Sequence, residues 1–228
     1  MEREIILTQD GTKTLFIKGW GEHYHSCHGA LKEARHVFIK NGLAKVKTPE
    51  INILELGFGT GLNLLVTLEE FLSRNSPKKI NYFAIEKYPV TQTEISILAY
   101  THHFSFPKKE ELYKKIHRES WEQDMELLPG FRFSKFRRDF FDLYSLELPK
   151  MHLVYFDCFG PRVQPDLWEK RLFSVVREKM EDKGILTTYS SKGSVRRILA
   201  ELGFYVEKLV GPPGKREMIN AIKNGKIQ

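Results

Sequence analysis

The sequence has few cysteines and lacks a long apolar run. Two cysteines in 228 residues, Cys27 and Cys158, are too few for a disulfide scaffold, and we expect both to be reduced, as in the cytosol. No apolar run approaches the roughly 18 residues that cross a bilayer, and the N-terminus has no apolar signal core. These absences exclude a disulfide-stabilised secreted domain and predict a cytoplasmic protein without a membrane segment.

Internal repeats and low-complexity linkers are also absent from the sequence. With 41% hydrophobic and 29% charged residues, the composition is that of a globular chain, neither disordered nor fibrous. A chain of this length can bury roughly 70% of the surface that its unfolded form exposes, so one core suffices. We therefore expect one domain over residues 1–228. A hairpin-and-helix extension over 1–42 and a helical insert over 99–130 would belong to it.

The positive charge is concentrated near the C-terminus. Residues 183–228 hold nine Lys/Arg against three Asp/Glu, whereas residues 1–182 hold 27 against 26. A localised basic field suits a polyanionic partner such as nucleic acid. The alternative is an ordinary solvated surface, and charge alone does not decide between them.

Apolar runs alternate with helical patterns along most of the chain. This order predicts an α/β fold in which helices cover both faces of a mostly parallel sheet. The last two strands are joined by Gly-Pro-Pro-Gly at 211–214 with no helix between them, so we expect them to pair antiparallel at an edge. The expected strands are 5–8, 14–18, 51–56, 80–85, 131–136, 151–156, 184–189, 204–210 and 217–222; the expected helices are 30–41, 61–74, 90–100, 108–118, 166–180 and 193–202.

A glycine-rich turn follows the strand expected at 51–56. It reads Gly57-Phe58-Gly59-Thr60-Gly61, so the third glycine comes one residue earlier than in the dinucleotide-binding pattern G-x-G-x-x-G. The acid expected about 20 residues beyond a dinucleotide turn is also missing. Such a turn can serve tight packing alone, but its place between a strand and a helix favours a ligand loop.

Acidic residues lie at or near the ends of four expected strands. Glu55 precedes the glycine turn, Glu86 ends the next strand, and Asp139 and Asp157 follow two later ones. Ligands of open parallel sheets bind at the carboxyl ends of the strands, so these acids predict a shared site. Asp139 can instead cap the segment that follows it.

The turn resembles motif I of the class I S-adenosylmethionine-dependent methyltransferases, which implies their Rossmann-like fold and their cofactor, S-adenosyl-L-methionine. In that family the glycine loop holds the methionine part, the acid of the second strand binds the ribose, and an acid–aromatic pair lies beside the adenine. The cofactor-binding residues that the resemblance implies are Glu55, Gly57, Phe58, Gly59, Gly61, Asn63, Glu86, Lys87, Asp139 and Phe140.

Longer segments resemble the methyltransferase half of the bacterial MnmC family. They read GFGTGLN at 57–63, FAIEKYP at 83–89, YSSKGSVRR at 189–197, GKREM at 214–218, and an Asp-x-Phe…Pro-x-x-Trp pattern that begins at Asp157. The resemblance implies N-methylation of 5-aminomethyl-(2-thio)uridine at the tRNA wobble position. It implies no flavin-dependent step, since residues 1–228 contain no dinucleotide fingerprint.

Asp157 is the catalytic candidate, because a carboxylate beside an amine can orient it and accept its proton. Phe159 can stack on a flipped base or belong to the core. The histidine-rich segment His23–His28 matches no standard zinc spacing, so we expect no metal site. The substrate-side residues that we expect are Tyr24, Ser26, Phe159, Pro161, Lys192, Arg196, Arg197, Lys215 and Arg216.

Three other functions are compatible with parts of this pattern. Aminopropyl transfer to a small amine uses a related fold with the same glycine spacing and strand-end acids. A non-catalytic RNA-binding domain can retain remnants of a cofactor loop, and a nicotinamide dehydrogenase is disfavoured by the glycine spacing. Binding of the cofactor and dependence on Asp157 would separate methylation from these alternatives.

Overall fold

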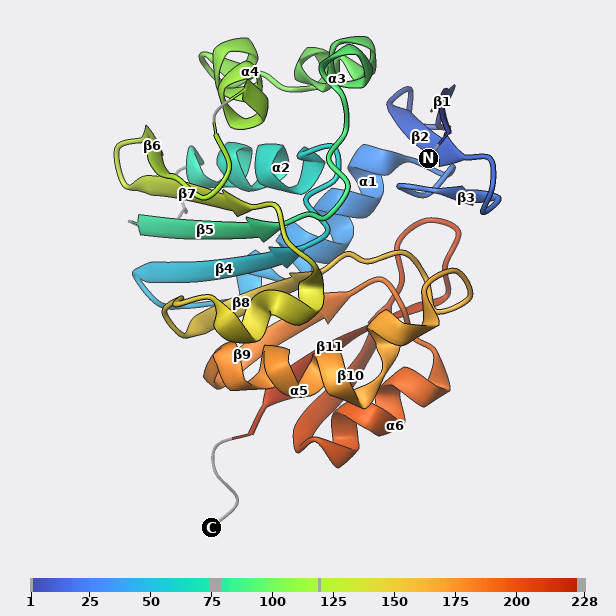
Figure 1. Cartoon of the computed structure of the whole chain (residues 1–228), viewed down its shortest axis with the longest axis vertical. Coiled ribbons are helices and arrows are strands. Elements are labelled where there is room, and N and C mark those ends of the chain that lie inside the picture. Colours follow the sequence, from blue (N-terminus) through green and yellow to red (C-terminus); the bar gives the residue numbers. More distant parts are fainter. Residues whose placement is uncertain (1, 74–78, 119, 225–228) are drawn as a thin grey trace.

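The computed structural model describes residues 2–73, 79–118 and 120–224. Within them an eight-stranded sheet runs in the order β10-β11-β9-β8-β4-β5-β7-β6 (Figure 1). The five inner parallel strands are β4 (Glu50–Leu56), β5 (Lys79–Ile85), β7 (Phe131–Phe136), β8 (Met151–Phe156) and β9 (Met180–Thr188). Strands β10 (Phe204–Val210) and β11 (Glu217–Lys223) form the antiparallel hairpin at one edge, which confirms the predicted C-terminal topology.

Helices cover both faces of the sheet (Figure 1). On one face lie α2 (Leu62–Phe71), α3 (Gln92–Leu98), α4 (Lys109–Arg118) and α1 (Ala30–Ala34), which continues as a π-helical turn over Arg35–Lys40. The opposite face carries α5 (Lys170–Lys179) and α6 (Gly193–Glu201). The mostly parallel α/β fold is therefore confirmed. No helix in the described part is long and apolar enough to cross a membrane.

Alternation along β4 decides which side chains reach the site. Ile51 and Ile53 pack with the α2 side of the core, whereas Leu54 and Leu56 pack with the α5 side. Because successive side chains of a strand point to opposite faces, Glu55 lies on the α2 side with the two isoleucines. An acid at this position is therefore directed beneath the first turn of α2.

A second, three-stranded sheet lies beside the carboxyl ends of the parallel strands (Figure 1). It consists of β1 (Arg3–Leu7), β2 (Lys13–Ile17) and β3 (Glu22–His23), and the first two form the hairpin predicted around Asp10-Gly11. Arg3 anchors this sheet to the main one: its guanidinium pairs with Glu94 at 3.1 Å and donates to the Tyr88 carbonyl at 2.9 Å. The small sheet thus closes over the end of the parallel strands.

Several expected elements differ from the observed ones in extent or type. The helix expected at 166–180 is a 3₁₀ turn over Pro165–Trp168 followed by α5, because Glu169 between them is extended. The helix expected at 90–100 is shortened by a capping box at Thr91 and a left-handed Ala99. The insert expected to be helical over 99–130 contains an edge strand, β6 (Asp124–Leu128). The helix expected at 61–74 is observed as α2, and Arg74 lies outside the described residues.

Candidate active site

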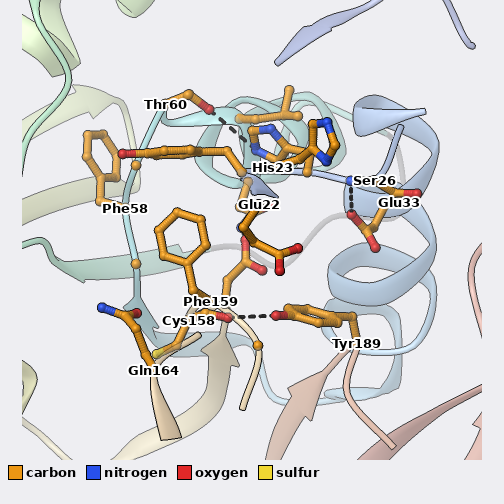
Figure 2. A pocket seen from close by; sticks show the side chains of 18 of the residues that line it. Glu22, His23, Ser26, Glu33, Phe58, Thr60, Cys158, Phe159, Gln164 and Tyr189 are labelled. Carbon is orange, nitrogen blue, oxygen red and sulfur yellow. Dashed lines mark hydrogen bonds between the residues drawn. The ribbon is translucent and has the colours of Figure 1, made fainter. Parts of the chain in front are cut away.

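A cavity of about 420 Å³ opens at the carboxyl ends of the central parallel strands (Figure 2). The N-terminal sheet, the glycine loop and the loops that follow β5, β8 and β9 all contribute to its wall. The expected site residues found in this wall are Tyr24, Ser26, Gly57, Phe58, Gly59, Asn63, Glu86, Lys87, Asp139, Phe140, Asp157, Phe159 and Lys215. Those not found there are Glu55, Gly61, Pro161, Lys192, Arg196, Arg197 and Arg216.

The glycine loop passes tightly between two strand ends. Gly57 has a φ of 98°, and a Cβ at this position would lie 2.5 Å from the carbonyl oxygen of Asp157. Its N–H donates to the Ile85 carbonyl at 3.0 Å. The N–H of Gly59 donates to Glu86 Oε2 at 2.9 Å. Glycine is therefore required at position 57 by both conformation and space.

Two residues of the predicted loop site lie outside the cavity wall. Gly61, with φ 73°, caps the N-terminus of α2. Glu55 is fully buried and accepts hydrogen bonds from Asn63 Nδ2 at 2.9 Å and from the Tyr82 hydroxyl at 2.8 Å. Burial raises the pKa of the Glu55 carboxyl well above its usual range. Glu55 therefore lies beneath Asn63 and outside the cavity wall, and its expected contact with the cofactor stays a prediction.

Asp157 lies where β8 ends and faces the cavity beside the glycine loop. Asn63 Nδ2 donates to its Oδ2 at 2.8 Å. Burial raises the pKa of its carboxyl to about 7, against the opposing effect of the Asn63 hydrogen bond. A carboxyl group with this pKa exchanges a proton readily at neutral pH.

The loop after Asp157 is held by hydrogen bonds to two consecutive carbonyl groups. The Tyr189 hydroxyl donates to the Cys158 carbonyl at 2.8 Å, as Figure 2 shows, and Trp168 Nε1 donates to the Phe159 carbonyl at 2.7 Å. These bonds give the Asp-x-Phe…Pro-x-x-Trp pattern a physical reason, because the tryptophan fixes the backbone next to the acid. Both cysteines are free, and Cys158 is buried in this loop.

Phe159 projects into the middle of the cavity (Figure 2). Its ring meets the edges of Trp20 and Tyr24 at centroid distances of 5.3 and 5.1 Å. The ring is partly exposed, so it is neither a core residue nor fully free. Three aromatic rings thus form one wall of the cavity.

Glu33 is a site residue that the sequence analysis did not identify. It is only 7% exposed, accepts from the Ser26 N–H at 2.7 Å, and pairs with Lys215 Nζ at 2.6 Å. Lys215 also lies 3.8 Å from the ring centre of Tyr189. Its place in the sequence could have indicated this role. Glu33 falls between Ala30 and Val37 on the apolar side of its helix, where an acid is unusual.

At the other end of the cavity, Asp139 has two partners. Its Oδ1 accepts from the Phe141 N–H at 3.0 Å, and its Oδ2 pairs with Lys87 Nζ at 2.6 Å. The capping interpretation of Asp139 is therefore confirmed, although its side chain also reaches the cavity wall. Lys87 and Asp139 connect the ends of β5 and β7.

The histidines of the segment 23–28 contact different residues and do not converge on one point. His25 Nδ1 lies 2.9 Å from Thr14 Oγ1, and His28 Nδ1 lies 3.1 Å from Gln9 Oε1. Burial lowers the pKa of His25 to about 4. Among the described residues, no group of three or more His, Cys, Asp or Glu side chains is placed to hold a metal ion.

Helix α4 braces the glycine loop from outside the cavity. The Tyr113 hydroxyl and His117 Nε2 lie 3.0 and 3.1 Å from the Thr60 carbonyl, to which both donate. Burial lowers the pKa of His117 to about 3, so its ring remains neutral with the proton on Nε2. The insert therefore helps to fix the loop conformation.

Known proteins similar to this chain agree on one enzyme class. Residues 140–224 match a family described as S-adenosyl-L-methionine-dependent methyltransferase. The bifunctional protein MnmC of Burkholderia mallei, named for tRNA 5-methylaminomethyl-2-thiouridine biosynthesis, is 30% identical across 94% of this chain, which spans 34% of that protein's length. The crystal structure of MnmC2 from Aquifex aeolicus superposes with a TM-score of 0.78 and 29% identity, covering 96% of this chain and 69% of that one.

The sheet order, the glycine turn and the family match define a class I S-adenosylmethionine-dependent methyltransferase. Within this class, the chain is a methyltransferase domain of the MnmC type, as the two relatives indicate together. Methyl transfer is accordingly favoured over aminopropyl transfer and over a non-catalytic RNA-binding role. Because the chain spans only about a third of the curated MnmC relatives, the substrate requires its own argument.

Proposed function

We propose that this domain transfers a methyl group from S-adenosylmethionine to the aminomethyl nitrogen of a 5-aminomethyl-(2-thio)uridine at the tRNA wobble position. The observation that carries the proposal is the position of Asp157, a carboxyl group with a pKa near 7 beside the glycine loop of the cavity. The names of the MnmC relatives support the nucleoside. A tRNA substrate would also place the reaction in the cytoplasm.

The cavity fits the proposed cofactor in volume and chemistry. Its 420 Å³ lies within the roughly 300–1,000 Å³ typical of small-molecule sites. Gly57 and Gly59 bring the loop backbone into the cavity wall next to Glu86, and Asp139 and Phe140 add an acceptor and an aromatic face. When bound, S-adenosylmethionine supplies an electrophilic methyl group on a sulfonium sulfur.

In this proposal Asp157 orients the amine and accepts a proton from its nitrogen, directly or through water. The carboxylate must be ionised to do so, and its raised pKa means that the ionised fraction grows through neutral pH. Phe159, with Trp20 and Tyr24, offers an aromatic surface for the base that leaves its stack. The rate of methyl transfer should therefore rise with pH, with a midpoint near pH 7.

The basic C-terminal part is proposed as the phosphate-contacting surface. Lys215 lies in the cavity wall, and a second hollow of about 350 Å³ shares Tyr189 and Lys215 with the cavity and extends to Arg216. Lys192 and Arg197 are exposed next to it at the start of α6. Contacts of this kind give affinity that depends on salt.

Methyl incorporation into under-modified tRNA tests the proposal. The purified domain should label tRNA that carries the aminomethyl group and leave fully modified tRNA unlabelled. Asp157→Asn should lower kcat by roughly 100-fold or more, since general-base catalysis contributes about 10²–10⁴. The matched control is Asp166→Asn, an exposed acid on the 3₁₀ turn, which should retain wild-type activity. Absence of labelling by the wild-type domain, or full activity of Asp157→Asn, would overturn the proposal.

A further inference from the structure

One amide nitrogen lies between the buried Glu55 carboxyl and the half-buried Asp157 carboxyl. Asn63 Nδ2 is 2.9 Å from Glu55 Oε1 and 2.8 Å from Asp157 Oδ2, so its two hydrogens serve two different acids. The Tyr82 hydroxyl donates to the remaining Glu55 oxygen at 2.8 Å. The hydrogen bonds therefore form a continuous chain from Tyr82 through Glu55 and Asn63 to the cavity.

The fold brings these groups together from three elements. Strands β4 and β8 are parallel neighbours in which Glu55 pairs with Tyr155, so Asp157 lies two residues beyond on the same face. Asn63 lies in the first turn of α2, above both strands. Asp157 and Asn63 line the cavity, whereas Glu55 is fully buried and absent from the cavity wall.

Among the described residues, the side-chain carbonyl of Asn63 is left without a hydrogen bond by this arrangement. Its Oδ1 is buried and makes no hydrogen bond within the described structure. Leaving a buried acceptor without a partner is unfavourable, so the amide is oriented toward the acids at the expense of its own carbonyl. This orientation is explained if the donor is needed by both carboxyl groups.

We propose that Glu55 is a positioning residue that acts through Asn63 to hold the Asp157 carboxylate in its orientation toward the cavity. The inference rests on the proposed function of Asp157. It also gives Glu55 a role other than the direct cofactor contact that the glycine-turn resemblance implies. Asn63 is the connecting group, and Tyr82 fixes the far side of Glu55.

Charges around Asp157 make the Asn63 hydrogen bond important. Burial disfavours the ionised carboxylate, and Glu33 disfavours it further, whereas Asn63 and Lys215 favour it. Burial raises the pKa of the Glu55 carboxyl, which favours its neutral form and so limits repulsion between the two acids. The other titratable groups that interact with Asp157 are Tyr189, just after β9, Tyr82 of β5 and the neighbouring Cys158. In the described structure, Asn63 is the hydrogen-bond donor to the Asp157 side chain.

The test follows the titration of Asp157 by carbon-13 NMR of aspartate-labelled protein, with Asp157→Asn to assign the signal. Asn63→Leu should raise the titration midpoint by about one pH unit or more, since a hydrogen bond to a charged group is worth about that much. Glu55→Gln keeps an acceptor for Asn63 and the side-chain volume, so it should leave the midpoint within about 0.5 unit. Glu55→Leu removes the acceptor and should shift the midpoint in the direction of Asn63→Leu.

Two further readouts separate this role from a cofactor contact. In each variant, the pH at which the methyl-transfer rate falls on the acidic side should shift by as much as the Asp157 titration midpoint. Affinity of the Glu55 variants for S-adenosylhomocysteine, measured by calorimetry, should stay within about threefold, as expected for a group outside the cavity wall. An unmoved midpoint in Asn63→Leu, or a tenfold loss of affinity in Glu55→Gln, overturns the proposal. Titration and calorimetry need no tRNA, so a wild-type domain inactive on tRNA would refute the proposed function alone.

Discussion

A single poorly solvated acid can make folding stability depend on pH, and Asp157 is such a residue. Its folded pKa of about 7 exceeds the value of 3.8 for an unperturbed aspartate. Between those values the folded state binds the proton more tightly, so the Asp157 contribution to stability declines as pH rises and is fully lost above 7. The shift corresponds to at most about 4 kcal/mol.

We therefore predict that Asp157→Asn stabilises the protein increasingly from pH 4.5 to pH 8 while it lowers activity. Asparagine avoids the cost of ionisation but cannot accept the proton. Urea unfolding at both pH values should show the variant gaining about 2–4 kcal/mol relative to wild type across this interval. The same difference at both pH values would show that Asp157 is not perturbed by burial.

The sequence could locate strand-end acids but not the direction of each side chain. Glu86, Asp139 and Asp157 face the cavity as expected, because each lies just beyond a strand. Glu55 lies one residue inside β4 and beneath Asn63 of α2, so α2 encloses it before the cavity begins. Glu33 comes from a helix that packs across the sheet, and its place in the site depends on tertiary packing that local pattern does not encode.

At the scale of elements, the glycine loop is the most constrained segment. We predict that Gly57→Ala destabilises the fold by roughly 2–4 kcal/mol, because a left-handed φ and a backbone clash coincide there. Affinity for S-adenosylhomocysteine, measured by calorimetry on the folded fraction, should fall at least tenfold. Gly19→Ala is the matched control, since a Cβ at Gly19 meets nothing within 4 Å. Equal behaviour of the two variants would remove the special role of the loop.

The loop after β8 depends on Trp168. Trp168→Phe keeps an aromatic ring against Phe156 but leaves the Phe159 carbonyl without its donor. We expect a loss of about 1–3 kcal/mol of stability and a higher KM for tRNA, measured by urea unfolding and steady-state kinetics. Trp121→Phe, whose indole makes no hydrogen bond in the described structure, should change neither quantity appreciably. A normal KM in Trp168→Phe would mean that the loop is held by other contacts.

Element boundaries were predictable where local chemistry sets them. The Gly-Pro-Pro-Gly turn placed β10 correctly, and the Asp10-Gly11 turn placed the first hairpin. Strands β3 and β6 were not predicted, because each is short and gains its pairing from a neighbouring strand rather than from its own pattern. Extended Glu169, which separates the 3₁₀ turn from α5, gave no signal in the apolar spacing.

At the scale of the whole molecule, acidic and basic side chains are concentrated in different regions. The cavity wall contains Glu22, Glu33, Glu86, Asp139 and Asp157 but only two lysines, which suits a cationic cofactor and an amine. The excess of basic residues lies after residue 182, and it includes Lys215 and Arg216 at the second hollow and Lys192, Arg196 and Arg197 at the start of α6. This separation would let tRNA phosphates bind at the basic surface while the cationic cofactor and the amine react in the acidic cavity.

Salt dependence of tRNA binding measures this separation. We predict that the double variant Lys192→Ala, Arg197→Ala weakens binding a few-fold at 0.15 M salt and reduces the slope of log K against log salt by about 1.5–2, as expected for two lost phosphate contacts. The double variant Lys114→Ala, Arg118→Ala removes the same charges from exposed positions on α4, which lies far from α6 (Figure 1). It should leave the slope within about 0.5 of wild type, because it changes net charge without removing a contact. Equal slopes for the two double variants would mean that tRNA responds to net charge alone and that α6 is not part of the binding surface.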